Sequence, residues 1–293
     1  MKKLPTILLT SSLLLTACGH NNHDNANEKT SKKSTNENKV ALQKAAKEYR
    51  KYTNEQLDQF LKGTEEFVSA IKADDIEKAK SLYPKVRMYY ERSEPVAEAF
   101  GDLDPKIDAR LADMKEEKKE DKWTGYHKIE KSLYQENKID EMTKKDANQL
   151  LKDAKELDAK VDTLDITPKL MLQGSVDLLN EVSTSKITGE EEVYSHTDLY
   201  DFKANTDLYD FKANIEGAQK IYELFKPELE KKDKKLSSTI KDNFNKVNQL
   251  LDKYKNNDGY KDYSAVTKED RKALSDAVNS LGEPLSKMAV VTE

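Results

Sequence analysis

One histidine and one glutamate, three positions apart, are the residues of this sequence with the clearest chemical potential. His127 and Glu130 lie in the stretch WTGYHKIEKSLY, where Thr124 and Gly125 can begin a helix. Because residues three apart share one face of a helix, the imidazole and the carboxylate can bind the same metal ion. Charged residues make up 36% of the chain, so such a pair also arises by chance. Spacing alone therefore leaves a metal site and a solvated helix surface as alternatives.

Further carboxylates lie upstream of this pair. Glu91 and Glu94 precede Pro95 and share a helix face, and Asp108 follows in the stretch DPKIDAR. On neighbouring helices of a bundle, such carboxylates and one histidine would form an oxygen-rich site suited to iron, manganese or zinc. Each acid taken alone is also compatible with exposed helix surface. The residues by themselves do not show whether these segments meet.

The first residues predict export and a lipid anchor. A basic start, MKK, is followed by a short apolar run and then by LTACG, the form of a signal peptide that ends in a lipobox. Residues 1–17 are expected to be removed, and Cys18, the single cysteine, to carry diacylglycerol and palmitate. The apolar run is shorter than the roughly 20 residues that cross a bilayer. An ordinary secretory signal with an incidental cysteine is the alternative. We expect a protein held by lipid on the extracytoplasmic face of the cell membrane.

Composition and net charge restrict the classes of molecule that the exported chain can bind. Residues 18–38 are rich in Asn, Ser, Thr and Lys and offer almost nothing to bury, which predicts a disordered, flexible tether behind the lipidated cysteine. Loss of Lys2 and Lys3 moves the formal net charge from −5 to −7. This balance argues against nucleic acid and favours cations. A lipidated Cys18 leaves no thiol for a disulfide or a cysteine metal site.

The elements that must position the candidate residues are helical. From Lys39 to Glu293 the chain has few glycines and prolines and many Lys, Glu, Leu and Ala residues. The clearest apolar stripe on one helix face comprises Ile240, Phe244, Val247, Leu250, Leu251 and Tyr254. Breaks are expected at Pro84, Pro227 and Pro284, among others, and no period-two pattern predicts a sheet. We predict an all-α fold of antiparallel helical bundles over a single domain, residues 39–293.

A literal tandem repeat interrupts this pattern. Residues 197–205 and 206–214 both read TDLYDFKAN. Nine residues advance a helix face by about 900°, half a turn beyond two full turns, so both copies cannot bury the same face of one helix. We expect one copy to form a loop or a local distortion. A lengthened helix with shifted contacts is the alternative.

Three blocks of the sequence, in this order and spacing, resemble one known family. They are YERSEPVAEAFGDLDPKIDAR, WTGYHKIEKSLY, and a third that opens GEEEVYSH and continues into the tandem repeat. The series resembles the imelysin-like (M75) family and, within it, the EfeO/EfeM lipoproteins of ferrous-iron uptake systems. The resemblance covers about Lys39 to Glu293. It implies a pair of four-helix bundles with a metal site in one of them.

The resemblance also implies a set of metal ligands. In this sequence they are His127, Glu130, Glu91, Glu94, Asp108 and Glu190. Glu191 or Glu192 could serve in place of Glu190. Relatives carry a single TDLYDFKAN-like block, so the repeat that begins one residue after His196 puts the Glu190 ligand in question.

The implied function is iron capture outside the cytoplasm. A protein of this kind would bind iron (Fe²⁺ or Fe³⁺), with zinc or copper as other candidate metals. It would pass iron to an EfeU-type membrane permease, beside an EfeB-type haem peroxidase. Two alternatives remain. An M75-type metallopeptidase is disfavoured because Lys128 and Lys131 occupy the positions of the general base and second histidine of an HExxH motif, so we expect no enzyme. A surface or adhesion spacer would bind no metal stoichiometrically.

Overall fold

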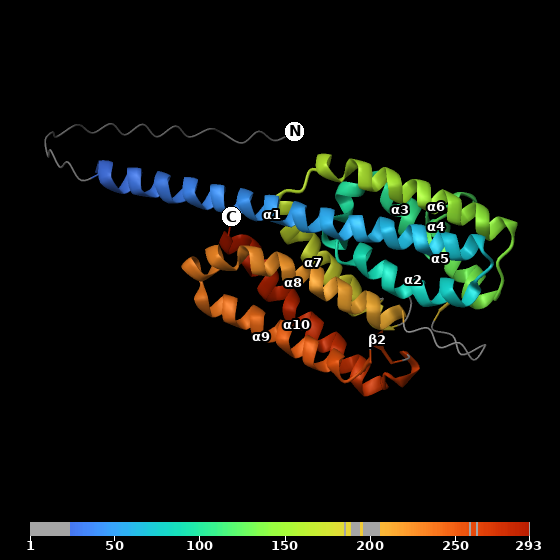
Figure 1. The fold of residues 1–293 in the computed structure, drawn as a ribbon. Coiled ribbons are helices and arrows are strands. Elements are labelled where there is room, and N and C mark those ends of the chain that lie inside the picture. Colours follow the sequence, from blue (N-terminus) through green and yellow to red (C-terminus); the bar gives the residue numbers. More distant parts are fainter. Residues whose placement is uncertain are drawn as a thin grey trace, which may run out of the picture. The chain divides into compact units, whose positions relative to one another are not determined.

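The computed structural model describes residues 24–184, 186–188, 194–195, 206–257, 259–261 and 263–292 (Figure 1). The chain divides into two units, Met1–Glu37 and Asn38–Glu293. The predicted signal peptide and Cys18 lie outside the described residues, so both stay predictions. Among the described residues, no helix combines the length and the apolar character needed to cross a membrane.

The first half of the body contains long helices joined by a stretch of short helical segments. The long helices are α1 (Asp24–Lys72), α2 (Ile76–Glu91) and α6 (Glu141–Lys160). The short segments are η1 (Glu94–Leu103), α3 (Asp104–Asp108), α4 (Leu111–Glu116), η2 (Glu120–Lys122), α5 (Tyr126–Glu130), η3 (Lys131–Gln135) and η4 (Val161–Thr163). Both α3 and α5 pack against α6. The short segments thus supply the side of this bundle that a fourth long helix would otherwise fill.

The second half is a four-helix bundle with a small hairpin. Its elements are α7 (Pro168–Thr184), η5 (Lys186–Thr188), α8 (Thr206–Lys232), α9 (Lys234–Asp252), β1 (Lys255–Asn256), β2 (Gly259–Tyr260), η6 (Tyr263–Ala265) and α10 (Lys268–Thr292). Helix α10 packs on α7 and α9, and α8 packs on the same two helices. The bundles meet where α8 packs on α2 and α7 packs on η1. The predicted all-α fold is confirmed.

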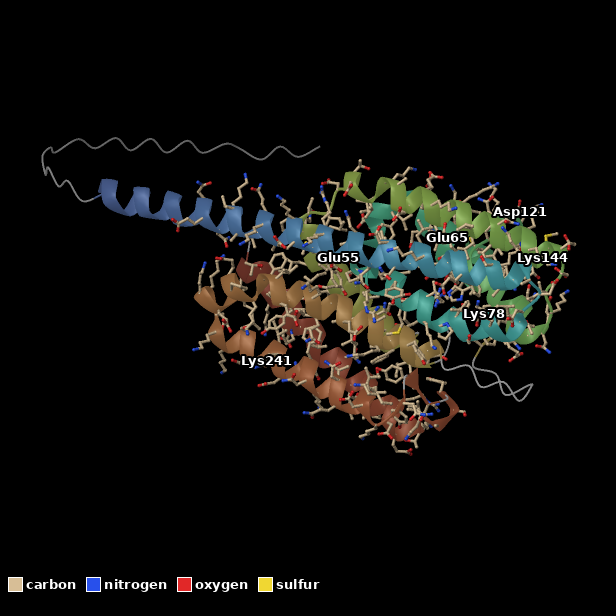
Figure 2. The ribbon with its side chains drawn as sticks, in the orientation of Figure 1. Glu55, Glu65, Lys78, Asp121, Lys144 and Lys241 are labelled. Atoms are coloured by element: carbon tan, nitrogen blue, oxygen red, sulfur yellow. The ribbon has the colours of Figure 1, made fainter. Side chains whose placement is uncertain are left out.

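Local chemistry explains where the helices begin. Asp75 caps α2 by accepting a hydrogen bond from the Lys78 N–H at 3.0 Å, and Asp233 caps α9 through the Leu236 N–H at 2.8 Å. The predicted stripe of α9 faces the core: Ile240, Phe244, Val247 and Leu251 are buried. Charged side chains such as Lys241 cover the outer face (Figure 2).

Three of the predicted proline breaks are wrong. Pro84, Pro227 and Pro284 lie inside α2, α8 and α10. A proline inside a helix costs about 3 kcal/mol through the lost hydrogen bond and a steric clash. Buried residues on both sides, such as Phe225 and Leu229 around Pro227, offset that cost by packing.

One further expectation differs from the structure, and one helix begins earlier than expected. Residues 255–260, expected to lack a sheet, form an antiparallel hairpin in which Lys255 pairs with Tyr260 and Asn256 with Gly259. Helix α1 begins at Asp24, inside the segment predicted as a tether, whose first residues lie outside the described ones. No glycine or proline lies between Asp24 and Lys39 to stop a helix from extending backward. Asn38, where the second unit starts, donates to the Thr292 carbonyl at 2.8 Å.

The second copy of the tandem repeat forms the first turns of α8. Leu208, Tyr209 and Phe211 enter the core, and the polar Asp210 and Asn214 are also buried. The second copy therefore holds the position that faces the first bundle. The first copy, residues 197–205, lies outside the described residues, and its expected loop or distortion stays a prediction.

Candidate metal centre

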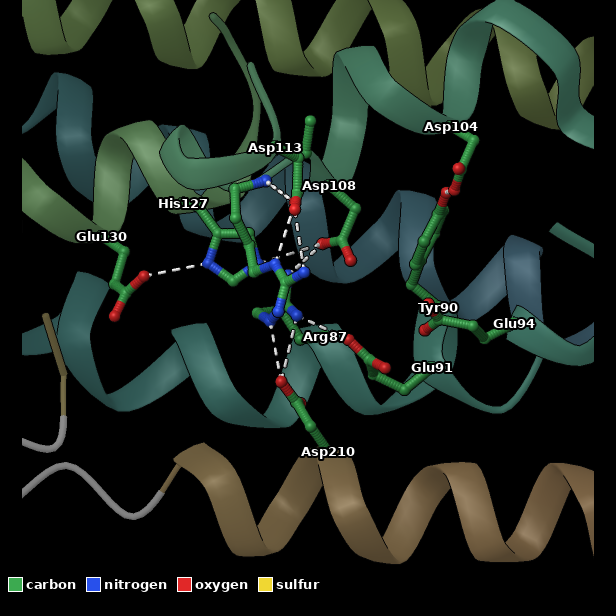
Figure 3. Close-up of polar contacts among 12 residues, drawn as sticks. Arg87, Tyr90, Glu91, Glu94, Asp104, Asp108, Asp113, His127, Glu130 and Asp210 are labelled. Atoms are coloured by element: carbon green, nitrogen blue, oxygen red, sulfur yellow. Dashed lines mark hydrogen bonds and ion pairs between the residues drawn. The ribbon is translucent and has the colours of Figure 1, made fainter. Parts of the chain in front are cut away.

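Three carboxylates from three consecutive elements converge between the bundles. Glu91 ends α2, Glu94 begins η1 and Asp108 ends α3. Each offers one oxygen, and these oxygens lie within 4.8 Å of one another. Glu91 is fully buried, and the side chains of Glu94 and Asp108 are 17% and 9% exposed. The structure thus brings together three of the predicted ligands (Figure 3).

His127 faces this cluster from α5. Its Nε2 lies 4.0 Å from Asp108 Oδ1, and its imidazole is buried. Gly125 makes the approach possible: its φ is +90°, and a Cβ there would lie 2.3 Å from the Ile107 carbonyl oxygen. Tyr126 fixes the start of the helix from the other side through a 2.8 Å hydrogen bond with Thr64. The local backbone therefore holds the imidazole beside Asp108.

Glu130 lies on the far side of the imidazole from Asp108 (Figure 3). Its Oε2 is 3.0 Å from His127 Nδ1, and its Oε1 accepts the backbone N–H groups of Tyr194 and Ser195 at 2.9 and 2.8 Å. Because Oε2 pairs with Nδ1, on the side of the ring away from Asp108, Glu130 is placed to orient His127. A carboxylate that orients a metal-binding histidine is a common arrangement. The geometry favours an orienting role for Glu130, and its role as a direct ligand stays a prediction.

Arg87 is a buried member of the cluster that the sequence analysis missed. Its guanidinium is fully buried and donates to Glu91 Oε1 at 2.5 Å, to Asp108 Oδ1, and to Asp210 Oδ2 at 3.0 and 3.2 Å. One planar cation thus joins α2, α3 and α8. The only signal in the sequence was its spacing of four residues from Glu91, which is common among exposed helix pairs.

Lys186 of η5 is a second buried cation that the sequence analysis missed. Its Nζ lies 2.8 Å from Glu91 Oε2 and 3.5 Å from Glu94 Oε2. Asn214 of α8 also donates to Glu91, at 2.9 Å to Oε2 and 3.0 Å to the backbone carbonyl. Glu91 is therefore held by groups from both bundles.

The buried charges shift the pKa values of the carboxyl groups in opposite directions. Burial, then the neighbouring Glu91, raises the pKa of Glu94 well above its usual range. Burial also outweighs Arg87 and raises the pKa values of Asp108 and Glu130 to about 7. For Glu91, Lys186 and Arg87 together outweigh burial and hold the pKa below its usual range. The metal-free pocket therefore retains protons near neutral pH, and a bound cation would displace them.

An acidic cleft of about 250 Å³ reaches the cluster from outside. Glu94 and Asp108 line it, together with Asp104 and Glu181. Arg110 also lines the cleft, but its guanidinium pairs with Asp113 at 2.8 and 2.9 Å. Closely spaced carboxylates raise the local concentration of cations. The cleft therefore gives a cation access to two of the three carboxylates.

The third-block ligand is not tested by this geometry. Glu190, Glu191 and Glu192 lie outside the described residues, as does His196. The turn at Tyr194 and Ser195, which follows them, is fixed to Glu130. Glu190 therefore stays a predicted ligand.

The donor set itself suits a hard or borderline cation. Carboxylate oxygens with one imidazole nitrogen are the ligands that iron and manganese accept, and zinc also takes them. This set fits the metals that the sequence predicted.

These features define an all-α protein of the imelysin type, with a buried cluster of carboxylates and one histidine between two helical bundles. The model of the imelysin family, peptidase M75, matches residues 45–288. An Efem/EfeO family lipoprotein of Staphylococcus haemolyticus strain JCSC1435 is 83% identical over 296 residues, which cover 100% of both chains. One of Staphylococcus aureus strain MSSA476 is 76% identical over 256 residues, 87% of each chain. The chain belongs to the imelysin family and, within it, to the Efem/EfeO lipoproteins.

If Glu130 acts through His127, the losses of iron affinity caused by substituting the two residues should not be additive. We expect Glu130→Ala to weaken iron binding about 10- to 100-fold, the usual cost of losing an orienting partner. We expect His127→Ala to weaken it more, and the double variant to bind no worse than His127→Ala alone. Anaerobic isothermal titration with Fe²⁺ measures all three. Additive losses would make Glu130 an independent ligand.

Metal affinity should fall as the pH is lowered. Asp108, with a pKa of about 7, must lose its proton to bind a cation, so protons compete below that pH. One such group predicts a loss of roughly twentyfold between pH 7.5 and 5.5. Titrations in two buffers of different ionisation enthalpy would also report the released protons. An affinity that does not change over this range would contradict the assignment of Asp108.

Proposed function

We propose that this chain is an extracytoplasmic, lipid-anchored protein that binds iron and passes it to an EfeU-type membrane permease. The observation that carries the proposal is the convergence of Glu91, Glu94, Asp108 and His127 at the inner end of an acidic cleft. Its membership of the Efem/EfeO lipoproteins supports the same function. An EfeB-type haem peroxidase is the proposed second partner.

The chemistry of capture follows from the charge of the pocket. Iron enters through the cleft, where Glu94 and Asp108 are the first cluster residues that it meets. The carboxylate oxygens and the His127 Nε2 then coordinate the iron, and Asp108 and Glu94 lose their protons. Glu130 holds the imidazole in the tautomer that presents Nε2 to the metal. Hard oxygen ligands bind iron without a thiolate, so the lipidated Cys18 remains free to serve as the anchor alone.

Delivery relies on the same cleft and on the anchor. Iron could leave through the same cleft, without unfolding of the bundles, to a partner bound at its mouth. Lipid on Cys18 would keep the iron-binding body close to a permease in the same membrane.

A peptidase function has less support in the geometry. Lys128, which stands where a zinc peptidase of the HExxH type has its general base, pairs with Asp146 of α6 at 3.1 Å. Metal-dependent cleavage of casein by the pure protein would nevertheless favour a peptidase over an iron carrier.

Removal of two cluster charges should abolish high-affinity iron binding. We expect the wild type to bind iron stoichiometrically and the double variant Glu94→Gln, Asp108→Asn to bind at least about 100-fold more weakly. Both carboxyl groups have raised pKa values, so the fold should tolerate the neutral amides. Glu283→Gln, which changes an exposed acid of α10, is the matched control. Isothermal titration with iron measures all three proteins. An equal affinity of the double variant and the wild type would refute the site. Absence of iron binding by the wild type would favour a spacer.

A further inference from the structure

Lys186 occupies the place where two of the proposed ligands meet. Its ammonium bridges Glu91 Oε2 and Glu94 Oε2, at 2.8 and 3.5 Å, and the residue is 1% exposed. A buried lysine is costly unless it is paired, so its position between these carboxylates has a structural reason. A cation that binds Glu91 and Glu94 has to enter the same space.

The two buried cations of the centre differ in how they are held. Arg87 is fixed by Asp210, which is outside the carboxylate cluster, and its guanidinium lies 5.7 and 5.9 Å from the ring centroids of Tyr83 and Tyr126. None of these contacts involves Glu91. The ion pairs that Lys186 makes with Glu91 and Glu94, in contrast, are with proposed metal ligands. The lysine ammonium is also a compact charge on a flexible four-carbon chain, whereas the arginine guanidinium is a rigid planar group.

We infer that Lys186 is a built-in competitor of the metal ion, whose ammonium neutralises Glu91 and Glu94 in the metal-free protein and is displaced when the cation binds. The inference rests on the proposed function. In the empty state, Lys186 limits the repulsion between two adjacent buried carboxylates. In the loaded state, it remains tethered next to the site and can return when the metal leaves. It therefore lowers the affinity for metal and assists release to an acceptor.

The competition has a direct electrostatic basis. Like charges at contact distance in a partly desolvated pocket repel each other strongly, so an ammonium and a metal ion cannot both hold Glu91 Oε2. Removal of the ammonium leaves the carboxylates in place for the metal and removes the cost of displacing Lys186. A purely structural lysine would act in the opposite way, because its loss would disorder the ligands and weaken binding.

The test compares variants of Lys186 by anaerobic titration with Fe²⁺. Lys186→Met keeps the length of the side chain and removes its charge, and we expect it to raise the affinity at least about tenfold. Lys80→Met is the matched control, because Lys80 is also buried but pairs with the neutral Asn137 amide at 2.7 Å. The control should bind iron as the wild type does. Affinity of Lys186→Met within twofold of the wild type, or below it, would overturn the inference.

Two further measurements keep the inference testable if Lys186→Met does not fold. Lys186→Arg should hold the carboxylates more firmly and weaken iron binding about tenfold, and unchanged affinity would count against competition. In the wild type, an amine-reactive reagent followed by mass spectrometry should modify Lys186 faster once iron is bound. An unchanged rate would show that the ammonium stays buried. Failure of the wild type itself to bind iron would refute the proposed function, which is a different result from failure of the competition.

Discussion

The structure depends on one buried guanidinium. Arg87 joins Glu91, Asp108 and Asp210, and so ties α2 and α3 of the first bundle to α8 of the second. Because ions are costly to bury unless they are paired, this network requires all three elements to be in register. Two of the carboxylates that it gathers, Glu91 and Asp108, belong to the cluster that we propose as the cation site. Folding and the proposed metal binding would therefore share these groups.

The buried centre holds more acidic than basic side chains. The carboxylates of Glu91, Glu94, Asp108, Glu130 and Asp210 surround two buried cations, Arg87 and Lys186. Three of these acids have raised pKa values, chiefly because they are buried. Under the proposed function, a metal ion would compete with protons for the same oxygens, and this competition would keep its binding reversible.

The periodicity of the sequence was enough to predict the fold but not the interior of the site. The stripe of α9 packs as expected, because apolar residues at helical spacing form one face that is stable only when it is buried in the core. The ligand blocks were found through a family resemblance, since nothing local brings Glu91 to Asp108. Arg87 and Lys186 were missed because charged residues are mostly exposed, and only tertiary packing reveals an exception. The helix breaks predicted at Pro84, Pro227 and Pro284 are wrong for a similar reason. Tertiary packing outweighs the tendency of proline to end a helix.

The central claim is that a cation binds inside this network, between the two bundles. The most direct test is a crystal structure of the iron-loaded protein, with anomalous diffraction recorded on both sides of the iron absorption edge. The account predicts one strong anomalous peak bounded by Glu91, Glu94, Asp108 and His127, with Glu130 still hydrogen-bonded to the imidazole. Iron bound only at surface acids, with the buried cluster unchanged, would contradict it.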